Sequence, residues 1–235
     1  MQPALLALLF VVLGLLGWRA VTRERGQYRR FKRLTSTHAR QRVYARWLLE
    51  SALVLAGLTG AVLLAAWPYL PRALRGFLDT PAGAVVWIGG VLVVATLLVA
   101  PAFLLRGDLD EIPAVGDIRA LLPRSRAELK YGVGLGVSAG VFEELLFRLA
   151  LPALLFGIVG SGPLAFGIAA VLFGMLHIYQ GPLGILFATL LGLVFAALYV
   201  LTGSIAAPIV LHVLVDLRSL VLIPIALGGA WRVRA

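Results

Sequence analysis

Three charged residues within one apolar stretch are the first sign of chemistry in this sequence. The stretch GVFEELLFRL places Glu143, Glu144 and Arg148 in a long run of aliphatic residues. A charged residue at the centre of a membrane span costs about 2.5–3.5 kcal/mol on insertion scales, whereas a neighbouring Leu or Phe returns only about 0.3–0.6 kcal/mol. Ionisable residues retained at such a cost mark a functional site by default.

Helical spacing gives the two glutamates different partners. Glu144 and Arg148 are four residues apart with the acid first, which is the favourable order for an ion pair on a helix. Glu143 is rotated by about 100° from Glu144. It shares its face with Gly136 and Gly140, which belong to a small-residue run that allows another helix to approach closely. We therefore expect Glu143 to point into the bundle without a cation of its own.

Two histidines lie in later apolar segments. The motif FGMLH ends in His177, with Phe173 one turn before it. The motif PIVLHVLVD contains His212 and Asp216, whose spacing lets the carboxylate orient the imidazole. Pro208 lies one turn before His212 and is expected to kink this helix. We predict that both imidazoles and the acidic cluster face one shared polar site.

The predicted site has the groups that hydrolysis needs. A carboxylate and two histidines can activate a water molecule, directly or on a metal ion, for attack on an amide bond. The chain has no cysteine and contains neither HExxH nor GxSxG. Ser138 lies near the acidic cluster, but nothing marks it as an activated nucleophile. A proton relay in a transporter uses the same residue types and is an alternative interpretation.

The composition predicts an all-α, polytopic membrane helix bundle. Of the 235 residues, 61% are hydrophobic and 14% are charged, whereas soluble domains carry about 25% charged residues. Seven apolar segments can be marked, which predicts about seven transmembrane helices in a single bundle. These segments are Pro3–Trp18, Trp47–Trp67, Ala84–Leu105, Tyr131–Ile158, Pro163–Ile178, Leu183–Leu201 and Ile205–Leu227.

Basic residues predict the orientation of the bundle. Almost half of the 21 Lys and Arg residues lie in the segment Arg19–Arg46, which we predict to be a cytoplasmic loop. This places the N-terminus outside, the loop Pro68–Thr80 outside, the loop Arg106–Lys130 inside and the C-terminus in the cytoplasm. The net charge of +10 is interpreted as this topology signal with some attraction to anionic lipid, and not as a nucleic-acid site.

Together, the three motifs resemble those of a known family of intramembrane proteases. EELLFR, FGMLH and HVLVD are similar in order, spacing and helical placement to the EExxxR, FxxxH and HxxxN/D signatures of the CAAX-protease and bacteriocin-processing family, also called CPBP or Abi. The resemblance spans roughly Ser125 to Leu220. It divides the chain into N-terminal membrane helices with the basic loop (1–105), a catalytic helix core (125–220) and the end of the last helix with a cytoplasmic tail (221–235).

The resemblance implies a role for each motif residue. Glu143 would activate the attacking water together with His177, and Glu144 and Arg148 would form a supporting ion pair. His212 and the acid one turn after it would stabilise the oxyanion of the tetrahedral intermediate. The implied catalytic set is Glu143, Glu144, Arg148, His177, His212 and Asp216.

Asp216 bears on whether the site holds a metal, because the family often has Asn at this position. An amide can donate a hydrogen bond to an oxyanion, whereas an ionised carboxylate only accepts. Asp216 must therefore be protonated, orient His212 or ligate a metal. Members of the family are described both as metalloproteases and as metal-independent glutamate proteases. We favour the metal-independent mechanism because HExxH is missing; the alternative is a divalent metal such as zinc. The ligands of such a metal would be Glu143, His177, His212 and Asp216.

The resemblance also suggests substrates. Eukaryotic relatives cut prenylated CAAX proteins, and bacterial relatives are associated with bacteriocin maturation or immunity. We therefore predict an endopeptidase of the bacterial plasma membrane that acts on a membrane-embedded or lipid-associated peptide. A catalytically silent scaffold or immunity protein of the same fold is a second interpretation, beside the transporter.

Overall fold

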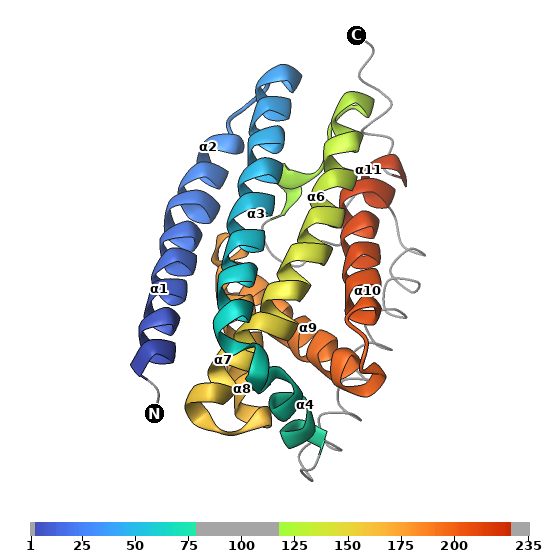
Figure 1. The fold of residues 1–235 in the computed structure, drawn as a ribbon. Coiled ribbons are helices and arrows are strands. Elements are labelled where there is room, and N and C mark those ends of the chain that lie inside the picture. The colour runs from blue at the N-terminus through green and yellow to red at the C-terminus, as the bar shows by residue number, and fades with distance from the viewer. Residues whose placement is uncertain (1–2, 79–117, 227–235) are drawn as a thin grey trace.

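The computed structural model describes residues 3–78 and 118–226, and every regular element within these ranges is a helix. Figure 1 shows α3 (Thr37–Ala66), α6 (Arg126–Glu144) and α10 (Ala206–Leu217) roughly parallel to one another, with α9 (Gly181–Thr202) crossing them obliquely. Both α3 and α10 pack against α6, so α6 is the central element. The predicted all-α bundle is confirmed.

The first two long helices are joined by a helical segment. α1 (Pro3–Arg19) continues into a π-helix, η1 (Ala20–Gln27), and then into α2 (Tyr28–Phe31). The segment Arg19–Arg46, predicted as a loop, is therefore mostly helical, and the chain turns at residues 32–36 before α3 begins. Arg and Lys are good helix formers, so a run of basic residues does not by itself end a helix.

The second half of the described chain carries the candidate site residues. α6 is followed directly by a π-helix, η4 (Leu145–Ala150), and then by α7 (Leu151–Val159). Gly160, at φ +68°, ends α7 in the left-handed conformation that glycine adopts without strain. α8 (Gly162–Leu176) packs against α7 and α9. The further elements are η3 (Arg119–Leu121), η5 (Ile178–Gln180), η6 (Arg218–Leu222) and α11 (Ile223–Ala226).

A short helix stands where the loop Pro68–Thr80 was predicted, at least up to residue 78. The chain leaves α3 through a 3₁₀ turn, η2 (Trp67–Tyr69), and forms α4 (Leu70–Leu78), which packs against α8. Pro68 has no amide N–H and cannot extend the hydrogen bonds of α3, but it is tolerated in the first turn of the element that follows.

Four helical stretches of the described residues are long and apolar enough to cross a membrane, and α8 is apolar but shorter. The third predicted segment, Ala84–Leu105, lies outside the described residues, as do residues 106–117 and the tail 227–235. The count of seven therefore stays approximate. The four stretches are Pro3–Thr22, Thr37–Phe77, Ile178–Thr202 and Ala206–Ile225.

A buried ion pair joins α3 to the start of α6. Arg40 on α3 is fully buried, and its Nε lies 3.1 Å from Oε1 and 3.2 Å from Oε2 of Glu128 on α6. Arg40 Nη2 also donates to the hydroxyl of Tyr44 and to the carbonyls of Ala120 and Leu122. Arg40 is thus a packing residue, although the sequence suggested only a topology signal for this basic segment.

Glycine residues bring α6 and α10 into contact. A methyl group added at Gly140 would lie 2.9 Å from the amide nitrogen of Val213, and one added at Gly136 would lie 3.1 Å from Cβ of Asp216. Two helices approach this closely only where one of them lacks a side chain. The predicted close approach at the glycine run is therefore present, and its partner is α10.

The structure adds one detail to this region and corrects another. The glycine face also includes Glu144, four residues after Gly140, and Glu144 is the glutamate that bonds to α10. Pro208 lies in the first turn of α10, where backbone N–H groups have no partner within the helix. It displaces no hydrogen bond within α10, which begins at Ala206, so the expected cause of a kink in this helix is missing.

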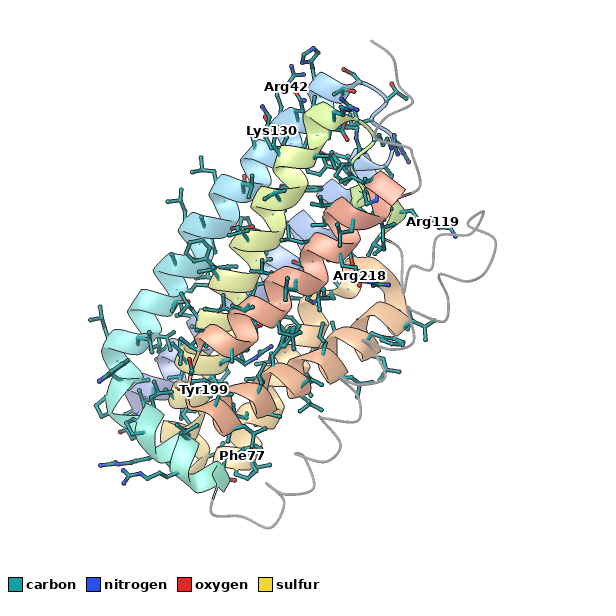
Figure 2. The ribbon with its side chains drawn as sticks, turned by 90° about the vertical axis from the view of Figure 1, so that its right-hand side faces the viewer. Arg42, Phe77, Arg119, Lys130, Tyr199 and Arg218 are labelled. Atoms are coloured by element: carbon teal, nitrogen blue, oxygen red, sulfur yellow. The ribbon has the colours of Figure 1, made fainter. Side chains whose placement is uncertain are left out.

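The basic residues of the described ranges are divided unevenly between the two ends of the bundle, and we call the end with more of them the basic end. Figure 2 shows Arg42 and Lys130 at one end, and Phe77 and Tyr199 at the other. Arg72 and Arg75 of α4 are basic residues at the second end. The first end combines the basic segment that follows α1 with the start of α6, two parts of the chain that are far apart in sequence.

Candidate active site

A buried carboxylate with two partners lies at the junction of α6, η4 and α10. Glu144 Oε2 lies 2.9 Å from Arg148 Nε, and Arg148 Nη2 donates to Oε1 at 3.2 Å. His212 Nδ1 lies 2.8 Å from the same Oε1. Glu144 and Arg148 are fully buried and His212 is nearly so. The predicted ion pair is confirmed, and His212 is a third member that the spacing within one helix could not indicate.

The Glu144–Arg148 ion pair spans the junction between α6 and a π-helical turn. α6 ends at Glu144, and Arg148 lies in the π-helix η4. A π turn widens the helix locally and occurs frequently at functional sites. Glu144, at the last position of α6, contacts Arg148 within this turn and His212 on α10.

Aromatic rings enclose the charges of this site. The Arg148 guanidinium carbon lies 4.9 Å from the ring centre of Phe173 and 5.5 Å from that of Phe195. The His212 ring stacks on Phe195 at 4.9 Å and meets Phe173 edge-on at 5.9 Å. The ring faces attract the cation and exclude water, which strengthens each charged interaction in the cluster.

The hydrogen bond to Glu144 fixes which nitrogen of His212 faces outward. A carboxylate oxygen accepts, so Nδ1 of His212 carries the proton that is donated to Glu144. Nε2 then lies on the other side of the ring, 3.8 Å from Oδ2 of Asp216. This distance is too long for a hydrogen bond. Glu144, and not Asp216 as predicted, is the residue that orients the imidazole.

His177 lies at the end of α8 and caps it. The amide N–H of His177 bonds to the carbonyl of Gly174, which leaves the carbonyl of Phe173 without its helical partner. His177 Nδ1 lies 2.9 Å from that carbonyl oxygen and must donate to it, because a carbonyl only accepts. The lone pair of His177 is therefore on Nε2, where it can accept a proton or a hydrogen bond.

Glu143 and His177 line one small cavity. The cavity measures about 50 Å³, which is room for a few water molecules. Both side chains are partly exposed, in contrast to the buried Glu144. His212 is not among the described residues that line the cavity, although the Phe173 ring contacts both imidazoles. The lining consists of Arg19, Leu55, Glu143, Leu176, His177 and Tyr179.

The predicted metal ligands do not form one compact group. The described residues contain no cluster of three or more His, Cys, Asp or Glu side chains arranged to hold a metal ion. Glu143 and His177 meet at the cavity, whereas His212 and Asp216 lie beside the buried Glu144. We therefore assign no chemical step to a metal and treat metal dependence as a question for experiment.

Sequence reasoning missed two polar residues of the cavity, Arg19 and Tyr179. Arg19 was counted with the basic segment, and Tyr179 follows FGMLH without belonging to any motif. One signal for Arg19 was available: it is the first charge after an apolar run, so it lies at the end of a span. Its approach to Glu143 depends on how α1 packs, which spacing along the chain does not determine.

Comparison with known proteins agrees with the motifs. Residues 126–218 match the family described as type II CAAX prenyl endopeptidase Rce1-like. This segment is similar to the Rce1-like family. No curated protein and no solved structure gives a significant match to the chain. The resemblance stated from the three motifs is thereby confirmed.

The Rce1-like segment contains all six predicted site residues, and α1 to α4 precede it. The Rce1-like family is a protease family, and several helices of this chain can span a membrane. The chain is therefore an integral membrane protein with a segment similar to the Rce1-like proteases. Its catalytic type, its substrate and a link to bacteriocin immunity stay predictions.

The two adjacent glutamates should differ in their effect on stability. Glu144→Gln removes the charge that faces Arg148 and His212, and breaking a buried pair typically costs about 3–5 kcal/mol. Glu143→Gln changes a partly exposed cavity residue and should leave the melting temperature of the purified protein unchanged. Thermal unfolding of both variants in the same detergent tests this. Equal melting temperatures for the two variants would contradict the assignment.

Proposed function

We propose that the chain is an intramembrane endopeptidase that hydrolyses a peptide bond of a membrane-associated protein or peptide. Glu143 and His177 activate the attacking water in this proposal, and no nucleophilic side chain is needed. The observation that carries it is the cavity that Glu143 and His177 share within the Rce1-like segment. A catalytically silent scaffold and a transporter are the competing functions.

The tautomer of His177 supports this role. Its Nδ1 proton is donated to the Phe173 carbonyl, so its Nε2 lone pair can accept one hydrogen of a water molecule in the cavity. The Glu143 carboxylate can accept the other. Two acceptors that converge on one water leave its lone pair directed at a substrate, which is the arrangement required of a general base.

The proposed step is a direct attack by water. The water oxygen bonds to the carbonyl carbon of the scissile peptide while its proton moves to Glu143, and the carbonyl electrons move onto the oxygen. The C–N bond then breaks, and the proton held by Glu143 passes to the nitrogen of the leaving amine. The products are a new carboxyl group and a new amine, so atoms and charge balance.

His212 is proposed to stabilise the oxyanion. Glu144 accepts the Nδ1 proton at 2.8 Å, so a second proton on Nε2 would form an imidazolium that the carboxylate stabilises. That Nε2–H could donate to the oxyanion. An ionised Asp216, 3.8 Å from Nε2, would stabilise the charge of this imidazolium without a hydrogen bond. The scissile carbonyl must lie beside the Phe173 ring, which contacts both imidazoles.

The family description suggests the first substrates to try. The Rce1-like family is described as CAAX prenyl endopeptidases, so we propose a farnesylated peptide ending in Cys-aliphatic-aliphatic-X as the probe. Its lipid would lie in the bilayer while its peptide reaches the cavity from the side or from the cytoplasm. Anionic lipid is the proposed partner of the basic end of the bundle.

Cleavage of this probe by purified protein tests the function, and the metal question with it. Glu143→Gln should lower turnover by about 100-fold or more, since general bases contribute that much. Asp216→Asn should keep its activity in the presence of a chelator if no metal takes part. A metal-dependent enzyme should instead lose about 10–100-fold on this substitution and regain activity with zinc.

Glu143→Gln also serves as the control in this assay. Glu143→Gln should fold and bind the probe without cutting it. Binding without cleavage by the unmodified protein would favour the silent scaffold and contradict the proposal. Cleavage that survives Glu143→Gln would contradict the role of this carboxylate.

We also propose that the basic end of the bundle is cytoplasmic, which follows from the positive-inside bias. The chain has no cysteine, so single cysteines can report the orientation. Arg42→Cys should react with a membrane-impermeant maleimide only after the cells are opened. Arg72→Cys, exposed on α4 at the other end, should react on intact cells. The reverse pattern would contradict the proposed orientation.

A further inference from the structure

An arginine from outside the Rce1-like segment reaches the proposed catalytic cavity. Arg19 is the last residue of α1, only 8% of its surface is exposed, and it lines the cavity with Glu143 and His177. The mechanism proposed above assigns no role to Arg19. A buried cation beside a water-activating carboxylate is costly in a membrane protein, and such residues mark substrate or ion sites by default.

We propose that Arg19 is a specificity-determining residue that binds a carboxylate of the substrate close to the scissile bond. The inference rests on the proposed function of Glu143 and His177. A guanidinium is permanently charged and planar, and its N–H groups match the two oxygens of a carboxylate. The chemistry recognised is a carboxylate, whether at the C-terminus of the peptide or on an acidic side chain.

The rest of the cavity favours one direction for a bound anion. Leu55 and Leu176 are apolar, so they neither screen nor bind a charge. Glu143 repels an anion and Arg19 attracts it, and both effects are strong where water is scarce. A peptide with a carboxylate on one side of its scissile bond would therefore bind with that side toward Arg19 and with its carbonyl toward Glu143.

The position of Arg19 is held by packing within the bundle. Its Nη2 donates to Oγ of Ser51 on α3 at 3.1 Å, and α1 packs against α3 and α7. A side chain held in this way loses little further freedom when a ligand binds, which favours affinity. The first helices, which carry no motif of the family, thus complete the cavity of the Rce1-like core.

A second contact joins the N-terminal helices to this cavity. Tyr179, which also lines it, stacks against His177 at 6.0 Å and meets Tyr28 of α2 edge-on at 5.3 Å. The η1 segment also packs against η5, which carries Tyr179. The cavity is therefore built between the N-terminal helices and the turn after His177, and Arg19 lies on the N-terminal side of that junction.

The test compares paired peptides on paired proteins. The probe is the farnesylated Cys-aliphatic-aliphatic-X peptide with a free C-terminal carboxylate, and its partner carries a C-terminal amide. A second pair, with an amidated C-terminus, places Asp or Asn at the residue after the scissile bond. The proteins are the unmodified chain, Arg19→Gln, Arg19→Lys and Arg33→Gln, a control at an exposed arginine outside the cavity.

Arg19→Gln should raise KM for a carboxylate peptide by about 10-fold to 100-fold, the range for a hydrogen bond to a charged group. KM for the matched amide should hardly change, and kcat should change less than KM. Arg19→Lys should recover part of the loss, because it keeps the charge without the planar fork. A difference within the first peptide pair identifies the carboxylate as the C-terminus, and a difference within the second pair identifies it as an acidic side chain.

Ser51→Ala separates this role from a structural one. If Arg19 only ties α1 to α3, Arg19→Gln and Ser51→Ala should lower the melting temperature alike and leave the ratio of acid to amide peptide unchanged. That result, or an equal loss on all peptides, would overturn the inference.

A binding measurement keeps the inference distinct from the proposed function. Glu143→Gln protein, alone and combined with Arg19→Gln, is titrated with the fluorescent acid and amide peptides. A preference for the acid that requires Arg19 supports the inference even if no peptide is cleaved, in which case the proposed function fails. Cleavage without any such preference overturns the inference and leaves the proposed function standing.

Discussion

The buried carboxylate of Glu144 is the constraint on which the rest of this structure depends. It has no access to water, so its charge must be balanced by Arg148 and by His212. These partners come from η4 and α10, and the aromatic rings of Phe173 and Phe195 close around them. The network can exist only if α10 lies against α6, and the glycine face of α6 allows that approach.

Because of this constraint, the adjacent residues Glu144 and Glu143 are assigned different roles, one in the buried network and one in the proposed mechanism. Glu144 contacts Arg148 and His212. Glu143 lines a cavity that has room for water, and His177 lines the same cavity. In the proposed mechanism His212 belongs to both parts of the site, because one ring nitrogen lies 2.8 Å from Glu144 and the other would face the oxyanion. The buried network of Glu144, Arg148 and His212 and the cavity lined by Glu143 and His177 thus lie on either side of the Phe173 ring, which contacts both imidazoles.

The sequence allowed the type of fold and the Glu144–Arg148 pair to be predicted, because apolar length and helical spacing are local properties. The link from Glu144 to His212 could not be predicted in the same way, since it depends on the π turn of η4 and on how α10 packs. The buried Arg40–Glu128 pair was not predicted, because the basic segment that contains Arg40 was interpreted only as a topology signal. The error over Pro208 arose because its effect depends on where the helix begins.

A double-mutant cycle on Glu144 and His212 tests the central claim most directly. The free energy of unfolding would be measured in one detergent for the unmodified chain, for Glu144→Gln, for His212→Gln and for the double variant. Residues in one hydrogen-bonded network typically show a coupling of about 0.5–3 kcal/mol, and independent sites add within about 0.3–0.5 kcal/mol. The account predicts coupling of about 1 kcal/mol or more; additive losses would contradict it.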